Sequence, residues 1–409
     1  MKSMARGDRR NPKPSVDNSA SRCRRASLKT GPKILFFGGG SAPKRLSTAL
    51  TAYTHNSIHL LTPFDSGGSS GELRRVFGMP SVGDLRSRLS ALAVENSEQQ
   101  QAFHRLFVHR IAPILSQAES RGEFEAILDG LHFLTADLSP GHRTIATASL
   151  RELAGQMPQA FDLRCASIGN LLLASRYLSS QRNLDEALEF YADLLGVRGL
   201  VRPTVDVDLE LSAQLEDGRV IDGQHRITGK EYPALTSRIV NLRLVNKGGK
   251  VRTPGPAIDS GIKTLIKTLI RTADLICFPM GSFFTSLVAN LLPQGVGREI
   301  AQSPSPKVFV PSLGFDPEIV GYSLADSVAL LLEYLRRDAG TDCSTSELLN
   351  AVILADNSLS YPAKKDLETE RRLIHEQGIS VVMAKVAEGD GRRHDAEALA
   401  RILVASRFA

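Results

Sequence analysis

Short apolar runs that end in glycine limit what this chain can fold into. Residues 33–37 (KILFF) meet three consecutive glycines, Gly38–Gly40, and a helical segment over 47–53 then leads to a second apolar run over 57–62. A short apolar run closed by glycine is typical of a buried parallel strand. Strand, loop, helix and strand in this order form a βαβ unit, so the sequence predicts a parallel α/β sheet.

The rest of the chain adds strands and a long helical segment. Apolar runs over 274–278, 307–310 and 379–383 predict further strands of the same sheet. From about residue 85 to 200 the apolar side chains recur at helical spacing, which predicts a helical insertion. The repeat is clearest at Phe103, Phe107, Ile111, Ile114 and Leu115.

The segments after the insertion are predicted one by one. Residues 205–215 are predicted to form a strand and 241–256 a connection. Residues 262–273 and 323–337 are predicted to form helices.

Positive charge gathers at the N-terminus. The net charge of the 409 residues is +6, but residues 1–30 hold nine Lys and Arg and two Asp, so the remainder is close to neutral. This tail has few apolar side chains and is expected to be disordered. It could contact RNA or an acidic partner, or simply be solvated. For the body of the protein a nucleic-acid partner is not expected.

Targeting signals and cysteine pairs are not visible in the sequence. No apolar segment follows the basic N-terminus as in a secretory signal, and no run reaches the ~18 apolar residues of a membrane span. The four cysteines, Cys23, Cys165, Cys277 and Cys343, are scattered, which favours neither a disulfide framework nor a cysteine zinc site. We therefore expect a cytoplasmic protein without a membrane partner.

The first glycine loop could bind phosphate. Gly38, Gly39 and Gly40 allow backbone N–H groups to approach an anion closely, and the N-terminus of the following helix favours negative charge. Pro43 stands where the dinucleotide-binding fingerprint has its third glycine, and no glycine precedes Lys44 as in a Walker loop. A phosphate loop and a plain tight turn both remain open.

A second loop, within residues 60–78, combines glycine, serine and charge. Asp65 follows the apolar run, and Arg74 and Arg75 could neutralise phosphate charge. Asp84 comes nineteen residues after Asp65, and two carboxylates beside phosphate suit a hard cation such as Mg²⁺. Asp84 could instead serve only as a helix cap. The residues predicted to form a phosphate-binding nest are Gly67, Gly68, Ser69, Ser70 and Gly71.

Two later stretches repeat this chemistry more weakly. After the run over 274–278, Gly281, Ser282 and Thr285 are small donors at a predicted helix start. Residues 220–229 (VIDGQHRITG) resemble a phosphate-contacting turn of ParB-like nucleotide-binding proteins, although a surface turn that contains His225 is the favoured interpretation.

Together, and in this order, the stretches resemble the CofD/YvcK family. They are FFGGGSAPKRLS, FDSGGSSGELRRVFGMPSVGDLRSRLSALA, SIGNLLLAS, LEDGRVIDGQHRI, ADLICFPMGSFFTSLVANLL and VGYSLADSV, within residues 33–330. The resemblance implies a Rossmann-like α/β fold, with helices on both faces of a parallel sheet. A single CofD-like domain over 31–409, with the helical insertion at about 85–200, is then expected.

The resemblance implies two alternative functions. CofD-branch proteins are 2-phospho-L-lactate transferases, which use Mg²⁺ and move a phospholactyl-type group from a guanosine dinucleotide to a deazaflavin hydroxyl. YvcK-branch proteins bind UDP-sugars and act in carbon metabolism and cell shape without established catalysis. Either branch implies a nucleotide-diphosphate-type ligand. A homodimer, or an ATP-grasp partner as beside one CofD-like subgroup, is also conceivable.

The family pattern also assigns roles to residues. Asp65 and Asp84 would be the catalytic and metal-binding carboxylates, and Asn170 would contact the nucleotide. Ser66 and Met280 stand at positions where the family usually has other residues, so the resemblance does not fix the substrate. The remaining residues expected to bind nucleotide or phosphate are Gly38, Gly39, Gly40, Lys44, Gly67, Gly68, Ser69, Ser70, Gly71, Arg74, Gly281, Ser282 and Thr285.

Overall fold

The computed structural model describes residues 29–94, 97–229, 232–246, 261–356, 361 and 366–405. Residues 1–28 of the predicted tail lie outside this range, so their disorder stays a prediction. In the described segments, no helix combines the length and the apolar character needed to cross a membrane.

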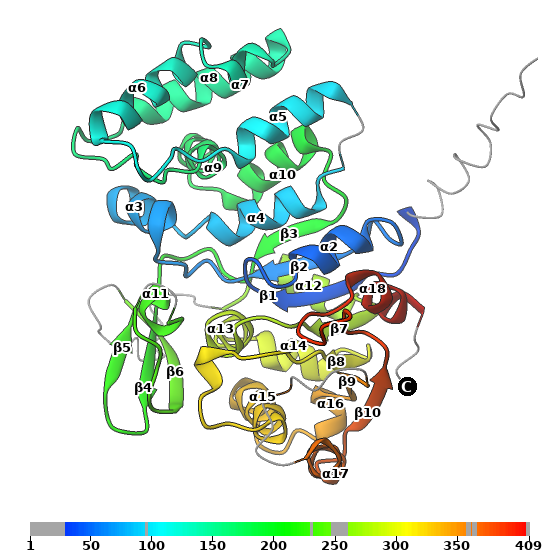
Figure 1. Cartoon of the computed structure of the whole chain (residues 1–409). Coiled ribbons are helices and arrows are strands. Elements are labelled where there is room, and N and C mark those ends of the chain that lie inside the picture. The colour runs from blue at the N-terminus through cyan, green and yellow to red at the C-terminus, as the bar shows by residue number, and fades with distance from the viewer. Residues whose placement is uncertain are drawn as a thin grey trace, which may run out of the picture.

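A seven-stranded parallel sheet forms the centre of the molecule (Figure 1). Its order is β10-β9-β8-β7-β1-β2-β3. From β1 the chain moves outward through β2 to β3, then returns to β7 on the other side of β1 and continues to β10. In open α/β sheets ligands bind where the strand order reverses, at the carboxyl ends of the strands. The strands are β1 Ile34–Gly38, β2 Ile58–Leu61, β3 Leu200–Pro203, β7 Leu275–Phe278, β8 Lys307–Phe309, β9 Ala351–Ala355 and β10 Ser380–Ala384.

Helices cover both faces of this sheet, which confirms the predicted α/β class (Figure 1). Helix α2 packs against α4 and α18, and α14 packs against α12 and α15. These helices are α2 Lys44–Leu50, α12 Thr264–Arg271, α13 Ala289–Leu291, α14 Val296–Gln302, α15 Leu324–Ala339, α16 Thr345–Leu348, α17 Leu367–Glu376 and α18 Ala396–Ala405, with the short π-helix η1 Phe283–Val288 and 3₁₀ turn η2 Pro317–Ile319.

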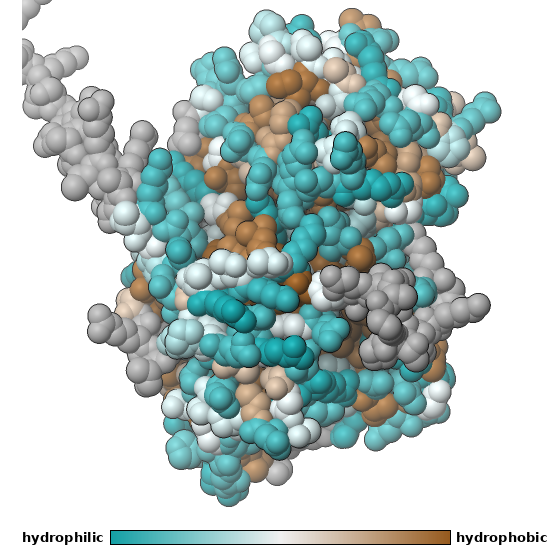
Figure 2. All heavy atoms as spheres, turned by 180° about the vertical axis from the view of Figure 1, so that it is seen from behind, coloured by the Kyte–Doolittle hydropathy of each residue, from teal (hydrophilic) through white to brown (hydrophobic). Residues whose placement is uncertain are grey.

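A helical layer covers the β2–β3 edge of the sheet, at the top of Figure 1. Its core is separate from that of the sheet and includes Leu61 of β2 and Val201 of β3. Seen from behind, hydrophobic side chains are exposed in small patches among hydrophilic ones (Figure 2). The layer contains α3 Gly68–Phe77, α4 Gly83–Leu92, α5 Glu98–Val108, α6 Gln117–Leu128, α7 Phe133–Ala136, α8 Pro140–Ala154, α9 Ile168–Ser179 and α10 Leu184–Leu195.

A small antiparallel sheet, in the order β5-β4-β6, lies beside the main sheet (Figure 1). Strand β4 spans Glu210–Leu215, β5 Val220–Asp222 and β6 Ile239–Val245, and the short helix α11 Gln224–Ile227 follows β5. This small sheet brings α11 toward the carboxyl ends of the main strands.

Several sequence predictions of elements are wrong. The predicted strand over 205–215 begins only at Glu210, because the preceding aspartates form ion pairs: Asp206 with Lys263 and Asp208 with Arg74. Strand β6 occupies the start of the predicted connection over 241–256, since its alternating Ile, Leu and Val pair with β4. Strands β3 and β9 were not predicted.

The predicted helical repeat around Phe103 also ends early. Helix α5 stops at Val108, and an extended segment follows. On that segment Ile111 is buried, whereas the side chain of Ile114 is 91% exposed. Both residues, and Leu115, therefore lie outside the helix to which their spacing assigned them.

Candidate functional site

The loops after β1, β2 and β7 line one cavity of about 370 Å³. The three strands are neighbours in the sheet, so their carboxyl ends meet at the position where the strand order reverses. The helices α4, α9 and α11 complete the walls. The cavity brings together eleven of the predicted site residues: Gly39, Gly40, Asp65, Gly67, Gly68, Ser69, Ser70, Asp84, Asn170, Gly281 and Ser282.

Five predicted site residues do not line this cavity. The carbonyl oxygen of Gly38 accepts a hydrogen bond from Asn290 Nδ2 at 2.8 Å. Lys44 is exposed at the start of α2. Gly71 packs inside α3, where a Cβ would lie 2.5 Å from the carbonyl oxygen of Ser66. The last two, Arg74 and Thr285, support loops from outside the cavity, as described below.

The first loop has no room for side chains where it meets Asp84. A Cβ on Gly40 would overlap Oδ1 of Asp84, and a Cβ on Gly39 would overlap Oγ of Ser286. Gly83, which precedes Asp84, is packed in the same way, because its Cβ would lie 2.9 Å from Oδ2 of Asp65. Glycine at these positions therefore allows both carboxylates to approach the loop.

A buried arginine holds the first loop from behind. Arg88 of α4 donates from Nη2 to the carbonyl oxygens of Gly39 (2.8 Å) and Gly40 (3.3 Å), and from Nη1 to the hydroxyl of Ser47. Burial lowers the pKa of Arg88 to about 10, against the opposing effect of Asp84. Arg88 does not line the cavity. The carbonyl oxygens of Gly39 and Gly40 therefore accept hydrogen bonds from a side chain that lies outside the cavity.

The second loop presents a helix N-terminus to the cavity. Asp65 Oδ1 accepts a hydrogen bond from the backbone N–H of Gly67 at 3.1 Å, and α3 begins at Gly68. The first N–H groups of a helix have no partner within it, and the helix dipole favours an anion there. Gly68, Ser69 and Ser70, which form this first turn, all line the cavity. The segment therefore has the geometry of a phosphate-binding site.

Arg74 holds the second loop as Arg88 holds the first. Its buried guanidinium donates to the carbonyl oxygens of Phe64 and Asp65, both at 3.1 Å, and forms an ion pair with Asp208 at 2.8 Å. It also donates to the carbonyl oxygen of Leu209 at 2.7 Å. The position of Arg74 thus does not support the predicted phosphate contact, because its donors are used on the protein side of the loop.

Two other arginines supply the positive charge of the cavity. Arg86 of α4 and Arg110, in the segment after α5, line its wall. Burial and the neighbouring Arg110 lower the pKa of Arg86 to about 10. Arg110 donates to the carbonyl oxygen of Cys165 at 2.6 Å. Sequence reasoning missed both arginines, although Arg86 lies two residues after Asp84 in the GDLRSRL stretch and could have been found there.

Polar side chains from α9 and α11 complete the cavity. Asn170 lines it with an Oδ1 atom that is buried and has no hydrogen-bond partner among the described residues. His225, with Gln224 and Thr228, also lines the cavity and lies in the short helix α11, so its interpretation as a surface turn residue is wrong. The ring Nδ1 of His225 lies 2.6 Å from the hydroxyl of Ser66, which also accepts the N–H of His225 at 3.2 Å.

Carboxylates and a serine hold the third loop, after β7. Ser312 Oγ accepts the N–H of Gly281 at 2.9 Å. Asp316 accepts the N–H of Phe283 at 2.9 Å. Glu318 accepts the N–H groups of Phe284 and Thr285, at 2.9 and 2.8 Å, and the Thr285 hydroxyl at 2.5 Å. The position of Thr285 therefore does not support the predicted phosphate contact, because its donors are already bonded to a buried carboxylate.

The oxygen donors of the cavity fit a magnesium ion. Asp65 and Asp84 line it together with the hydroxyls of Ser70 and Ser286. Mg²⁺ in nucleotide sites is commonly held by one or two carboxylates, with phosphate oxygens and water as the other ligands. Two carboxylates next to the N-terminus of α3 meet the carboxylate part of that requirement.

A second, more apolar hollow of about 220 Å³ lies beside the first loop. Ala42 lines both hollows, and Met280 lines the second while the adjacent Gly281 lines the first. The second hollow is otherwise formed by Leu46, Leu313, Leu399, Arg45, Ser312, Arg392, Arg393, His394 and Ala396.

Comparisons with known proteins agree with this architecture. The family model described as 2-phospho-L-lactate transferase CofD matches residues 34–387. A putative gluconeogenesis factor of Nostoc sp. is 29% identical over an alignment of 389 residues, and the match covers 92% of this chain and 69% of that protein. The gluconeogenesis factor of Bacillus subtilis is 28% identical, over 91% of this chain and 97% of that protein.

A further relative and a solved structure complete the comparison. A putative gluconeogenesis factor of Deinococcus radiodurans is 31% identical, over 76% of this chain but only 53% of that longer protein. A crystal structure of a member of the UPF0052 family from Bacillus halodurans has a TM-score of 0.65 at 22% identity, and covers 91% of this chain and 98% of that one. That likeness shows the fold. The family model matches most of the chain, and the chain therefore belongs to the CofD family.

Proposed function

We propose that this protein is a Mg²⁺-dependent transferase that takes a phosphorus-containing group from a nucleotide-diphosphate-type donor. The observation that carries the proposal is the pair of adjoining hollows: a polar one fitted for phosphate and a more apolar one beside it, with Ala42 in both walls. A transferase needs a place for the donor and a place for the acceptor. A protein that only binds a nucleotide needs the first alone.

The polar cavity supports binding of a pyrophosphate. The first turn of α3 provides backbone N–H groups at Ser69 and Ser70, and Arg86 and Arg110 add two fixed positive charges. Positive groups in a partly buried cleft bind phosphate more strongly than they would in water. Asn170, with its unpartnered Oδ1, could accept a hydrogen bond from a base or a sugar of the donor.

The second hollow supports binding of an acceptor with a flat or apolar body. Leu46, Met280 and Leu399 provide apolar surface, and Arg392 and Arg393 provide positive charge at its wall. An acceptor that carries a hydroxyl on an apolar ring system, with or without an acidic group, suits this lining.

The proposed reaction would use these positions as follows. The hydroxyl oxygen of the acceptor forms a bond to the outer phosphorus of the donor, the P–O bond of the pyrophosphate bridge breaks, and a nucleoside monophosphate leaves. The hydroxyl proton passes to Asp65 or Asp84. Mg²⁺ held by these two carboxylates would neutralise part of the pyrophosphate charge. Arg86 and Arg110 would stabilise the charge that develops on the leaving phosphate.

A second candidate function is supported by the names of the relatives. The proteins of Nostoc, Deinococcus and Bacillus subtilis are all named as gluconeogenesis factors. By analogy, the polar cavity would bind a nucleotide-sugar and the protein would act as a regulator without turnover. The cavity chemistry is common to both candidates, so the distinction depends on Mg²⁺ and on cleavage.

The two candidates can be separated with GDP, GDP-mannose and UDP-glucose. Titration calorimetry with and without Mg²⁺ measures binding, and ³¹P NMR measures the release of nucleoside monophosphate. A transferase should bind a nucleotide with Mg²⁺ and slowly release the monophosphate, with water acting as a poor acceptor. Asp84→Asn should reduce that release by on the order of 100-fold or more, while Asp193→Asn, an exposed change on α10, should have no effect.

Other results of these experiments would favour the regulator or reject both candidates. Tight binding of UDP-glucose without Mg²⁺, with no release and no effect of Asp84→Asn, would support the nucleotide-sugar regulator. If none of the three nucleotides binds to the folded protein, both candidates fail.

A further inference from the structure

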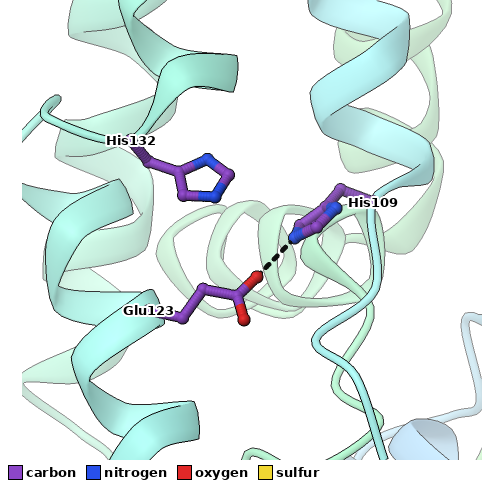
Figure 3. Close-up of side chains that lie close together, drawn as sticks. All are labelled: His109, Glu123 and His132. Atoms are coloured by element: carbon purple, nitrogen blue, oxygen red, sulfur yellow. Dashed lines mark hydrogen bonds and ion pairs between the residues drawn. The ribbon is translucent and has the colours of Figure 1, made fainter.

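Three side chains with metal-binding atoms converge in the helical layer, away from the cavity (Figure 3). They are His109 at the end of α5, Glu123 within α6 and His132 at the start of α7. One ligand atom from each lies within 4.8 Å of the other two, and all three side chains are half-buried. Figure 3 shows the two rings and the carboxylate directed toward a common space between the three elements.

The backbone around this group is well fixed. The carbonyl oxygen of His109 accepts the N–H of Ile168 at 3.0 Å, which ties the segment after α5 to α9. The N–H of His132 donates to the carbonyl oxygen of Ala126 at 3.0 Å, which closes the turn between α6 and α7. A capping box between Ser116 and Glu119 sets the start of α6. The three side chains are therefore presented by positions that are held in place independently of any ligand.

Ordinary hydrogen bonding accounts for only part of the arrangement. His109 Nε2 and Glu123 Oε1 are 2.6 Å apart, as in a charge-assisted hydrogen bond. His132 is not part of this hydrogen bond. Its Nδ1 atom accepts the N–H of Leu134 at 3.4 Å, which is a weak hydrogen bond. The third side chain thus lies beside the pair with only this weak hydrogen bond, while its ring packs against Phe133 with the ring centroids 4.4 Å apart.

We propose that His109, Glu123 and His132 bind a Zn²⁺ ion. Zinc takes imidazole nitrogen and carboxylate oxygen at about 2.0–2.2 Å, often from two histidines and one glutamate with water as the fourth ligand. Tetrahedral bonds of that length place ligand atoms roughly 3.3 Å apart. His109 Nε2 and Glu123 Oε1 are 2.6 Å apart, and no two of the three ligand atoms are more than 4.8 Å apart, so small side-chain rotations suffice. Imidazole ligands favour zinc over Mg²⁺ or Ca²⁺, which prefer oxygen.

The ion would connect the outer helices to the cavity wall. It would join α6 and α7 to the segment that follows α5, and the next residue of that segment, Arg110, lines the polar cavity. His109 has an extended backbone, with φ −60° and ψ 143°, and successive side chains of an extended segment project to opposite sides. The metal would therefore lie on one side of this segment and the cavity on the other.

The test uses the full chain, freed of metal with a chelator and titrated with ZnCl₂. We expect one tight equivalent by calorimetry, a higher Tm with ZnCl₂ than without, and no comparable effect of MgCl₂. Cobalt should replace zinc and give the visible absorption of a tetrahedral centre. Hydrogen exchange should slow in α6 and α7 when zinc is added.

Two substitutions in the site and one outside it make the test specific. Glu123→Gln keeps a hydrogen bond to His109 and should leave the metal-free protein folded, yet weaken zinc binding by more than about 100-fold, since the loss of a mere outer partner already costs 10–100-fold. His132→Gln should do the same. His375→Gln, an exposed histidine on α17, should leave zinc binding unchanged. The proposal is overturned if Glu123→Gln and His132→Gln still bind zinc as tightly as the original protein, or if the original protein binds none.

Discussion

The loops after β1 and β2 are held in the opposite way to the loop after β7. Buried arginines, Arg88 and Arg74, bind the carbonyl oxygens of the first two loops. Ser312, Asp316 and Glu318 instead bind the backbone N–H groups of the third. An anion needs N–H donors, so a loop tied mainly through its carbonyls keeps most of the groups that phosphate requires, although the N–H of Gly67 is bonded to Asp65. A loop tied through its N–H groups has already used them.

This difference teaches why loops of similar composition have different roles. All three contain glycine and serine after a buried strand. The first two should bind the charged part of the ligand, while the third shapes the cavity through Gly281 and Ser282 and separates it from the second hollow through Met280. The first two loops also differ from one another, because Arg74 has a carboxylate partner in Asp208, whereas Arg88 binds two carbonyls and a hydroxyl.

The largest effect is expected from breaking the carbonyl support of the second loop. Arg74→Met removes a buried guanidinium and leaves Asp208 and three carbonyl oxygens without it. We expect a loss of about 3–5 kcal/mol in the free energy of unfolding, as for other broken buried ion pairs, measured by urea denaturation. Arg88→Met, which removes hydrogen bonds to two carbonyls and a hydroxyl together with an electrostatic attraction to Asp84, should cost less.

The matched control for Arg74 is its neighbour. Arg75→Met removes an exposed ion pair with Glu72, and such pairs contribute about 0–1 kcal/mol. Equal losses for Arg74→Met and Arg75→Met would contradict the structural role assigned to Arg74.

The next effect concerns pH and the third loop. Burial, with Asp316 nearby, raises the pKa of Glu318 from 4.5 to about 7. Between these two values the folded protein holds a proton that the unfolded chain has released, so stability falls as pH rises from 4.5 to 7. The total is up to about 3 kcal/mol. Glu318→Gln should remove this slope, which urea denaturation at pH 5, 6, 7 and 8 would measure.

An exposed glutamate serves as the control for this pH dependence. Glu368→Gln, on the surface of α17, should keep the slope of the original protein. A Glu318→Gln protein that loses stability with pH as steeply as the original would show that Glu318 does not retain its proton in the fold.

The third prediction concerns the close packing between the first loop and Asp84. Gly40→Ala places a methyl group onto Oδ1 of Asp84, so either the carboxylate or the loop must move. We expect the affinity for GDP with Mg²⁺ to fall by about 10–100-fold, equal to about 1.4–2.7 kcal/mol, by titration calorimetry. Gly122→Ala, in α6 with no atom within 4 Å of the new Cβ, should leave affinity unchanged and stabilise the helix. Unchanged affinity in Gly40→Ala would remove this loop from the phosphate site.

The smallest effect is expected at Thr285. Thr285→Val removes the hydroxyl that donates to Glu318 and should cost about 1 kcal/mol of stability. The affinity for GDP with Mg²⁺ should stay within about twofold, because no donor of Thr285 remains for phosphate. A large loss of affinity with little loss of stability would show instead that the third loop binds the ligand directly.

The sequence indicated the strands and loops of the site because these signals are local. The apolar run over 33–37 and its glycines can be read within a few residues, and so can the segment from Asp65 to Ser70. Strand β3 was missed because it depends on a distant partner: it pairs with β2, more than a hundred residues earlier. Strand β6 was misassigned because its alternating apolar residues lie next to a stretch rich in glycine and proline.

The roles of the charged residues could not be predicted from local sequence signals. Arg74 and Arg86 look alike in the sequence, yet one binds carbonyl oxygens behind a loop and the other lines the cavity. Only the packing of α3 and α4 decides this. The same holds for His225, which reaches the cavity because the small antiparallel sheet positions α11, and for the group of His109, Glu123 and His132, which three separate elements bring together.

The hydrogen bond from Asn290 to the carbonyl oxygen of Gly38 joins residues 252 positions apart. During synthesis, therefore, the first loop leaves the ribosome long before its partner exists, and the cavity cannot be complete until the chain has been made beyond residue 290. A nascent chain stalled before that point should not retain a nucleotide. Nucleotide binding by the ribosome-bound protein would thus report that its central strands have assembled.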